Sequence, residues 1–471
     1  MGLYERAGGY RELLRNATFL RLFGGRVITD TGDSLYFVAT MWLVWELTNS
    51  TFYTGLAVAL VQIPTALNFL VGPLVDRWEL RRVLVATQVL NGVGVLVVPA
   101  AAALGHLSIW LLVVLVPLLT FVNGFVYPAQ NAALPRVVEK AQLTKANSLF
   151  STSVRAIDTV SKGIGGALIA LVSATSLFVV DSVTFAVAAV LFLGVSVPKS
   201  GETSESDETE RERSDGRERD VEAASDGGTK TGDERDDDGP DGSPQESDGG
   251  PSESSRETDG GAVESYLSEL RDGIDYVRGS ALVPIIFSAM VINFGFMAAD
   301  AVLPAFAESL GGPDAYGVLL AAIGAGTFVG SAGAFLVEER SVSRVTIVGY
   351  PIAGVTLAGA VTVPGTWPTA ALLFATAVFP GTFNVMVFTL VQSAVDESLL
   401  GRVSSLVKGA TSIMAPTGAL FGGTMGGYVG TETVLYLFGA ALPLFGLYFL
   451  AHPALRSLPP AGEADEKSIG L

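Results

Sequence analysis

Residues 107–130 read LSIWLLVVLVPLLTFVNGFVYPAQ and contain no charged side chain over 24 positions. A helix needs about 20 mostly apolar residues to cross a bilayer core about 30 Å thick, whereas a buried strand runs for only about 4–8 residues. This run therefore predicts a transmembrane helix. A water-soluble core has no need of many such runs in succession, so their number along the chain decides the fold class.

Eleven further apolar runs of similar length flank this one. The predicted transmembrane helices are 20–46, 53–75, 82–104, 107–130, 145–171, 174–197, 281–308, 315–337, 343–363, 367–392, 403–429 and 432–451. The sequence thus predicts an all-α integral membrane protein with twelve transmembrane helices, six on each side of a long polar segment.

That polar segment explains the net charge. Residues 200–260 hold 22 acidic and 7 basic residues, and therefore −15 of the formal charge of −18, and Val221 is their single large apolar residue. Such a composition buries too little surface to offset chain entropy. We expect a disordered acidic linker that acts as a solvated tether, with a regulatory or partner-binding role as the alternative.

The chain divides at this linker. The predicted parts are a cytoplasmic N-terminal segment at 1–18, an N-terminal six-helix bundle at 19–198, the linker at 199–262, an interfacial amphipathic helix at 263–280, a C-terminal six-helix bundle at 281–453 and a cytoplasmic tail at 454–471. The amphipathic helix is inferred from apolar residues at helical spacing, which favours a position along the inner membrane surface.

Lys and Arg sort to one side of the predicted topology. The loops that would lie outside (47–52, 105–106, 172–173, 309–314, 364–366 and 430–431) contain none, whereas the N-terminus and the even-to-odd connections are rich in them. Positive charge is retained on the cytoplasmic side of a membrane. Both termini and the linker are therefore expected in the cytoplasm of a plasma-membrane protein.

Composition also excludes several classes. The chain has no cysteine and only two histidines, His106 and His452, which excludes disulfide scaffolds, thiolate zinc sites and multi-histidine metal centres. It has no P-loop for nucleotide-driven transport and no basic face for nucleic acid. No nucleophile–base pair appears. We therefore expect no enzyme activity, no cofactor, no metal and no nucleic-acid partner.

The two halves are related in sequence. Residues 138–149 align with residues 395–406 at four identical positions of twelve, and each segment leads from the fourth helix of its half to the fifth. Two six-helix halves that both start inside form a parallel repeat. In such proteins substrate sites lie near the midplane between the repeats, and access alternates as one half rocks against the other.

Residues 72–82, GPLVDRWELRR, carry a more specific signal. They resemble the loop motif of the major facilitator superfamily, G-x-x-x-D-R/K-x-G-x-R/K-R/K, with Glu79 in place of the usual glycine. The resemblance implies the major facilitator fold, in which the twelve helices form two pseudo-symmetric six-helix bundles, and a small-molecule substrate.

Three further stretches resemble the exporter branch that contains the enterobactin and macrolide efflux proteins. They are Gly32-Asp33, Tyr127-Pro128-Ala129 with the following Leu134-Pro135 and Ala146-Asn147-Ser148-Leu149, and Asp181-Ser-Val-Thr-Phe185. Two features depart from the exporters of the superfamily. The fourth helix lacks the Arg that is often associated with proton transfer, and Ser161-Lys162 occupies the place where the Gly-Pro motif of antiporters is expected.

Two predicted helices each carry three charged residues at offsets that place them on one face. They are Arg26, Asp30 and Asp33 in the first helix and Arg155, Asp158 and Lys162 in the fifth. Intramembrane charges usually face a cavity or a partner. In the family the resemblance names, these helices belong to one bundle, which predicts an ion network between them. Asp33, nearest mid-membrane, is the first candidate for proton coupling and Asp30 the second. A static network that only holds the bundle together is the alternative.

Other polar and aromatic residues inside the predicted helices are candidates for a substrate cavity. They are Gln62, Asn123, Asn293, Phe296, Asp300 and Asn384. Hydrogen bonding between helices accounts equally well for the amides, lipid or core packing for the phenylalanine, and a position at the water boundary for Asp300.

The loop motif is interpreted as a conformational latch made of Gly72, Asp76, Arg77, Arg81 and Arg82. Asp76 would accept hydrogen bonds at the positive N-terminus of the eleventh helix, near residue 403, and hold the inner side closed. The arginines would pair locally or with acidic lipid. The alternative is that the motif only anchors the topology.

Together these features predict a secondary active transporter that exports small amphipathic molecules or drugs by proton antiport and alternating access. Two alternatives stay open. One is a proton- or sodium-coupled nutrient importer on the same fold, and the other is a non-transporting membrane sensor or scaffold that acts through the acidic linker. The expected partners are the substrate, a coupling ion (H⁺, with Na⁺ as the alternative) and the lipid bilayer, and the protein is expected to act as a monomer.

Overall fold

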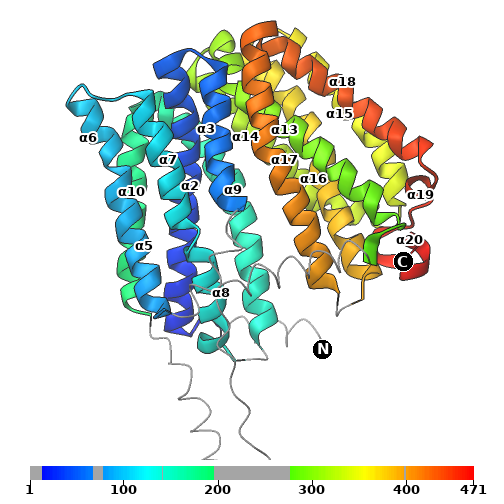
Figure 1. The fold of residues 1–471 in the computed structure, drawn as a ribbon, viewed down its shortest axis with the longest axis horizontal. Helices are drawn as coiled ribbons and strands as arrows, with labels where there is room; N and C mark the ends of the chain where they lie inside the picture. Colours follow the sequence, from blue (N-terminus) through cyan, green and yellow to red (C-terminus); the bar gives the residue numbers. More distant parts are fainter. Residues whose placement is uncertain (1–12, 67–77, 140–141, 196–275, 397–398, 471) are drawn as a thin grey trace, which may run out of the picture. The chain divides into compact units, whose positions relative to one another are not determined.

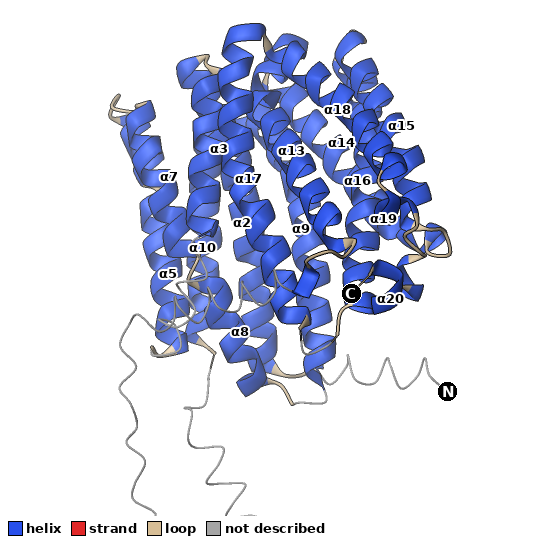
Figure 2. Cartoon of the chain, turned by 45° about the vertical axis from the view of Figure 1, so that its right-hand side comes forward, coloured by secondary structure: helices blue, strands red, loops and turns tan. Residues whose placement is uncertain are grey.

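The computed structural model describes residues 13–66, 78–139, 142–195, 276–396 and 399–470. Every long element in these ranges is a helix (Figures 1 and 2). In the first half of the chain they are α2 (Ala17–Thr48), α3 (Thr51–Ala66), α5 (Leu80–Val95), α6 (Val97–Ala103), α7 (Ile109–Asn123), α8 (Val126–Val137), α9 (Leu143–Val172) and α10 (Ala174–Leu193). In the second half they are α13 (Leu282–Leu310), α14 (Pro313–Ala332), α15 (Val342–Thr362), α16 (Thr366–Ala394), α17 (Leu400–Val429) and α18 (Thr431–Ala451).

These helices coincide with the predicted spans. The α5–α6 and α7–α8 pairs each follow one span, and the 3₁₀ turn at Gly333–Val337 extends α14, so the described residues hold twelve helical segments. Eight of them are long and apolar enough to cross a membrane. The fourth segment runs to Val137, seven residues beyond its predicted end, and α3 is described only as far as Ala66.

Proline explains the interruptions in two segments. Pro99 has no N–H to donate to the carbonyl of Val95, and the third segment breaks there between α5 and α6. Pro128 likewise cannot bond to the carbonyl of Gly124, and α7 gives way to α8 at that point. Because other proline-containing helices, such as α13 with Pro304, continue without a break, the sequence alone does not predict which prolines interrupt a helix.

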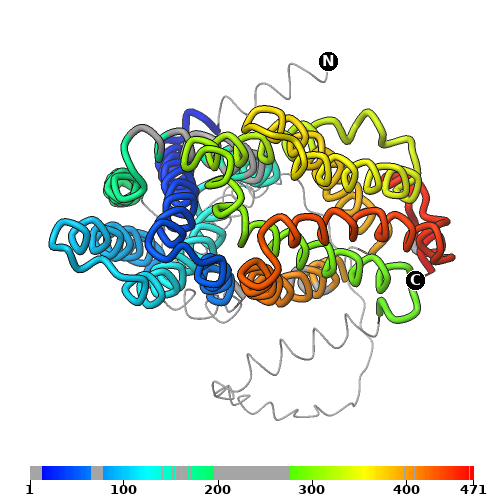
Figure 3. Tube along the Cα trace, turned by 90° about the horizontal axis from the view of Figure 1, so that it is seen from above, coloured from blue at the N-terminus to red at the C-terminus, as the bar shows by residue number. Residues whose placement is uncertain are grey.

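The helices form two six-segment bundles, one on each side of the view from above (Figure 3). In the first bundle α2 packs against α10 and α9, and in the second α15 packs against α18 and α16. The bundles meet along two principal seams, where α3 packs against α17 and α9 against α14. The aligned repeat segments lead into α9 and α17, which are both 30 residues long, so the sequence repeat corresponds to a structural one.

Glycine makes the α3–α17 seam close. A Cβ atom built on Gly423 would lie 2.8 Å from the Cα of Gly55, and one built on Gly55 would lie 2.9 Å from the Cα of Gly423. The hydroxyl of Thr51 donates a hydrogen bond of 2.7 Å to the carbonyl of Gly423, and the hydroxyl of Thr54 donates one to Ala301 of α13. Small residues let transmembrane backbones approach each other in this way.

The chain after α18 folds back onto the second bundle. The amide of Ala281 donates a 2.7 Å hydrogen bond to the carbonyl of Ile469, and the amide of Val342 donates one of 3.2 Å to Pro459. This tail includes two short helices, α19 (Pro453–Arg456) and α20 (Glu466–Ile469). The predicted acidic linker and residues 263–275 of the predicted amphipathic helix lie outside the described residues.

Replacing Gly423 with valine is expected to destabilise the protein by about 1–3 kcal/mol, because overpacking a close contact forces the two backbones apart. Gly401→Ala on the same helix is the matched control, since no atom lies within 4 Å of the added Cβ there. Alanine is also the better helix former, so this control is expected to be neutral or slightly stabilising. Denaturation in SDS, followed by the fluorescence of the five tryptophans, measures both. Equal stability of the two variants would contradict the close seam.

Candidate functional site

A cavity of about 410 Å³ lies within the helices of the first bundle and reaches α13 of the second. Its apolar wall comes from several helices and includes Phe37, Val58, Leu119, Phe185 and Met297. Four carboxylates line it as well, those of Asp30, Asp33, Asp181 and Asp300. This volume lies within the range of small-molecule sites, which are mostly apolar with a few placed polar groups.

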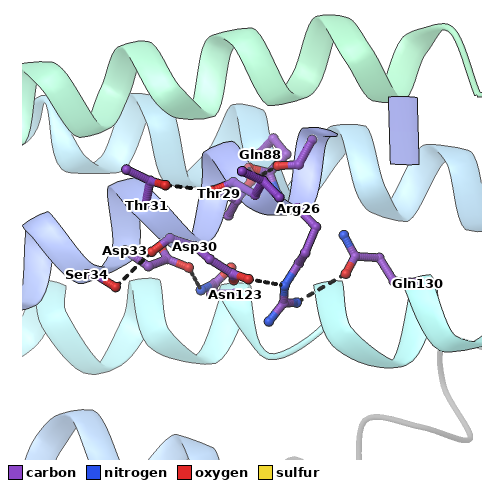
Figure 4. A network of polar contacts seen from close by, with 11 residues as sticks. Arg26, Thr29, Asp30, Thr31, Asp33, Ser34, Gln88, Asn123 and Gln130 are labelled. Atoms are coloured by element: carbon purple, nitrogen blue, oxygen red, sulfur yellow. Dashed lines mark hydrogen bonds and ion pairs between the residues drawn. The ribbon is translucent and has the colours of Figure 1, made fainter. Parts of the chain in front are cut away.

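The charged residues of α2 begin with an ion pair. Arg26 Nε donates to Asp30 Oδ2 at 2.7 Å, one helical turn further along, and both side chains are largely buried. Arg26 Nη1 also donates to Gln130 Oε1 of α8 at 3.2 Å, and the guanidinium lies 5.5 Å from the ring centroid of Tyr127. Figure 4 shows Arg26 extending from α2 with Asp30 and Gln130 on either side of its guanidinium group. The pair and its contacts thus join α2 to α8.

Asp33 lies on α2 nearly one turn beyond Asp30, and its side chain has a different partner. Asn123 Nδ2, at the end of α7, donates to Asp33 Oδ2 at 2.7 Å (Figure 4). A neutral amide hydrogen-bonds this carboxylate without neutralising it. Asp30 and Asp33 therefore differ in environment, because only Asp30 has a salt bridge among the described side chains.

Asp181 on α10 is a site residue that sequence reasoning missed, as is Asn91 on α5. The side chain of Asp181 is completely buried and lines the same cavity. It packs against the backbone of Gly32, because a Cβ atom on Gly32 would collide with Asp181 Oδ1 and Thr184 Oγ1. The signal was present in the sequence, since Asp181 is the single charged residue of α10 and an intramembrane acid is a functional candidate by default.

Several buried polar atoms around these carboxylates have no hydrogen-bond partner among the described side chains. They include Oδ2 of Asp181, both amide atoms of Asn91, Oδ1 of Asn123 and the hydroxyl of Tyr36. Asn91 is 1% exposed and lines the cavity from α5. Because buried polar groups are normally paired, this cluster is typical of a site that takes a further ligand.

Three of the six residues predicted to line a substrate cavity do so in the structure, and three do not. Gln62, Asn123 and Asp300 line the cavity, and Gln62 Nε2 lies 3.8 Å from Met297 Sδ across the α3–α13 contact. Three others lie away from it. Asn293 has a buried, unpaired Oδ1 among the described residues, the ring of Phe296 packs edge-on against Phe438 at 5.1 Å, and Asn384 is exposed.

The predicted partners on the fifth segment, Arg155, Asp158 and Lys162, belong to α9, but their side chains lie outside the described part of the structure. α9 packs against α2, and Val154 lines the cavity. The predicted network between these two helices therefore stays a prediction.

Two residues of the predicted latch, Arg81 and Arg82, lie at the start of α5. Gly72, Asp76 and Arg77 fall outside the described residues. Arg81 and Arg82 are exposed, and Arg82 Nε bonds to Glu79 Oε2 at 2.7 Å. Glu79, the residue that departs from the superfamily motif, thus pairs with an arginine of that motif. An exposed pair of this kind contributes little to stability.

The fold and the cavity define a membrane transporter of two six-helix halves. The sequence model of the Major Facilitator Superfamily matches residues 22–407. The chain belongs to this superfamily.

Three relatives are similar in sequence. The MFS-type transporter YvqJ of Bacillus subtilis strain 168 is 21% identical over 92% of this chain and 91% of its own length. The MFS-type transporter YjbB of the same strain is 26% identical over 33% of this chain and 39% of its own. Macrolide efflux protein A of Streptococcus pyogenes is 23% identical over 40% of this chain and 47% of its own length. The chain therefore spans less than half of the last two relatives.

Solved transporter structures share the fold. A mutant of the nucleoside transporter NupG superposes with a TM-score of 0.63 at 10% identity, over 93% of this chain and 99% of its own. A bacterial homologue of the human lysosomal transporter Spinster, in an inward-facing and occupied conformation, gives a TM-score of 0.61 at 13% identity, over 92% of this chain and 95% of its own. At these identities the likeness concerns the fold alone.

The Arg26–Asp30 pair is expected to contribute a coupling energy of about 1.5–3 kcal/mol, as hydrogen bonds to charged groups in buried positions do. A double-mutant cycle of Arg26→Gln, Asp30→Asn and the double variant measures it from unfolding free energies in SDS. The double substitution should destabilise the protein less than the sum of the two single substitutions, because each single variant already loses the interaction. Strict additivity would show that the two side chains do not interact.

Proposed function

We propose that this protein is a proton-coupled exporter of small amphipathic molecules that works by alternating access in the plasma membrane, with both termini in the cytoplasm. The observation that carries the proposal is the cavity, in which carboxylates are held among apolar side chains of several transmembrane helices. Such a site offers an apolar surface to a substrate and an ionisable group to a coupling ion.

The side chains that line the cavity favour a positively charged, partly apolar substrate. Four aspartates and no Lys or Arg are among the described residues that line it. Carboxylates in a site of low dielectric favour positive charge. An amphipathic molecule with a basic group fits both the apolar wall and the acids. Export, as the direction, is supported by the partial similarity to macrolide efflux protein A.

A nutrient importer is the second candidate, and the number of polar groups in the cavity favours it. Asn91, Asn123 and Gln62 add amides to the four carboxylates, and polar solutes are held by such groups. The two candidates differ in the direction of coupled movement.

The deciding experiment uses inside-out membrane vesicles that contain the full-length protein. A pH gradient and a Na⁺ gradient are imposed separately, with a panel of cationic dyes and macrolides outside. The proposal expects accumulation driven by an acid vesicle interior and no effect of Na⁺. Accumulation that requires the opposite pH gradient indicates the importer, and accumulation driven only by Na⁺ overturns proton coupling.

Asp33→Asn is expected to abolish gradient-driven accumulation and to leave downhill movement of the dye in place, because the neutral amide keeps the shape but takes up no proton. For one exchanged proton, a pH difference of about one unit supports an accumulation of about tenfold, and this factor should be lost. Asp314→Asn, an exposed substitution in the first turn of α14, is the control. Undiminished accumulation in Asp33→Asn would remove this residue from coupling.

Alternating access predicts that the α3–α17 seam must open during transport. A Cβ atom on Gly427 would lie 3.6 Å from Thr51 Oγ1, which suits a disulfide between cysteines at these positions. The chain has no native cysteine, so Thr51→Cys/Gly427→Cys introduces the only pair. Oxidation is expected to stop transport and reductant to restore it, and each single variant is a control. Full activity of the completely cross-linked protein would exclude movement at this seam.

A further inference from the structure

Asp33 and Asp181 line the same cavity in the first bundle. Both line it, one from α2 and the other from α10, and Asp181 Oδ1 packs against Gly32, the residue that precedes Asp33. Gly32 makes this approach possible, because any larger residue there would collide with the Asp181 carboxylate. The closeness of the two acids is therefore built into the packing of α2 on α10.

The described partners of these acids are neutral. Asn123 donates to Asp33 at 2.7 Å, and the hydroxyl of Thr184 lies 3.2 Å from Asp181 Oδ1. Asp181 Oδ2 has no partner among the described groups although the residue is fully buried. An ionised carboxylate in such a position is strongly disfavoured, and two nearby carboxylates do not readily ionise together.

The charged and titratable groups on the surrounding helices are few. On α2, Arg26 is paired with Asp30. α5 and α7 contribute the neutral amides of Asn91 and Asn123 to the cavity, and α3 contributes Gln62. The remaining titratable groups that line the cavity are Tyr36 on α2 and Asp300 on α13. α9 also carries Arg155, Asp158 and Lys162, whose side chains lie outside the described part.

We propose that Asp33 and Asp181 share one proton and together form the coupling-ion site, so that the second carboxylate of the site comes from α10. The inference deepens the proposed function and rests on it for the coupling role. Binding adds one proton between the two carboxylates and moves no electrons. Release returns the proton to water and leaves two carboxylates, one held by Asn123 and the other by Thr184.

The unpaired amide of Asn91 fits this arrangement. It lines the same cavity beside the acids, and both of its polar atoms are free of partners among the described residues. Its NH₂ group can donate to a carboxylate that has lost the shared proton, and its oxygen can accept from a protonated one. Asn91 is thus a positioning residue for both states of the pair.

The test is infrared difference spectroscopy of the full-length protein in lipid bilayers, which detects the carbonyl stretch of a protonated carboxyl group without any substrate. The sample is titrated between about pH 5 and pH 9, where an ordinary aspartate, with a pKa of about 3.9, stays ionised. The wild type is expected to show one such band that disappears as the pH rises. Asp181→Asn and Asp33→Asn are each expected to change the pH at which it disappears, because the like charge that raises the affinity for the proton is gone. Asp314→Asn should leave that pH unchanged.

Three results would overturn the proposal. A wild type without the band shows that both acids are ionised, and this result needs no variant to fold. A band that titrates at the same pH in Asp181→Asn as in the wild type shows that Asp181 does not share the proton. A band that vanishes when Na⁺ replaces K⁺ at constant pH and ionic strength assigns the site to sodium.

The vesicle assay separates this proposal from the function that it deepens. A band with the expected behaviour, together with no pH-driven transport of any dye or macrolide, upholds the shared proton and contradicts the proposed efflux. Proton-driven transport that survives in Asp181→Asn upholds efflux and contradicts the shared site.

Discussion

The bilayer interior offers no water to a polar group, and this constraint determines the rest of the structure. Backbone amides must be satisfied inside each segment, which permits helices and excludes irregular chain facing lipid. The described spans are accordingly helical from end to end, and the interruptions at Pro99 and Pro128 are confined to one or two residues. The same constraint applies to side chains, so Arg26, Asp30 and Asp33 of α2 have partners on other side chains inside the first bundle.

The absence of water also changes how helices associate. Lipid is as apolar as leucine, so helices gain little by hiding apolar side chains and associate by close packing instead. The Gly55–Gly423 contact brings α3 and α17 together at one seam, and Gly32 lets the Asp181 carboxylate reach the backbone of α2. Glycine therefore has two roles here. It closes the contact between the bundles, and it brings the two acids to one place.

The two bundles contribute unequally to the cavity. It lies mainly in the first bundle and touches α13 through Met297 and Asp300. The aromatic residues of the second bundle pack on one another, as in the Tyr350–Phe445 pair at 4.5 Å. The two halves share a sequence repeat and an architecture, but three of the four carboxylates that line the cavity, those of Asp30, Asp33 and Asp181, belong to the first half.

The sequence by itself determined the number of helices, their order and the superfamily, because hydrophobic length and the loop motif are local properties that need no knowledge of contacts. It also placed Arg26, Asp30 and Asp33 on one face, since helical periodicity sets that arrangement. Tertiary structure decided the partners. It paired Asp33 with Asn123, brought Asp181 from a helix nearly 150 positions away in the chain, and left Asn293 and Asn384 outside the cavity. The physical reason is that the rotation of a helix about its axis is set by packing against neighbouring helices. The sequence of one helix does not determine which neighbour its polar face contacts.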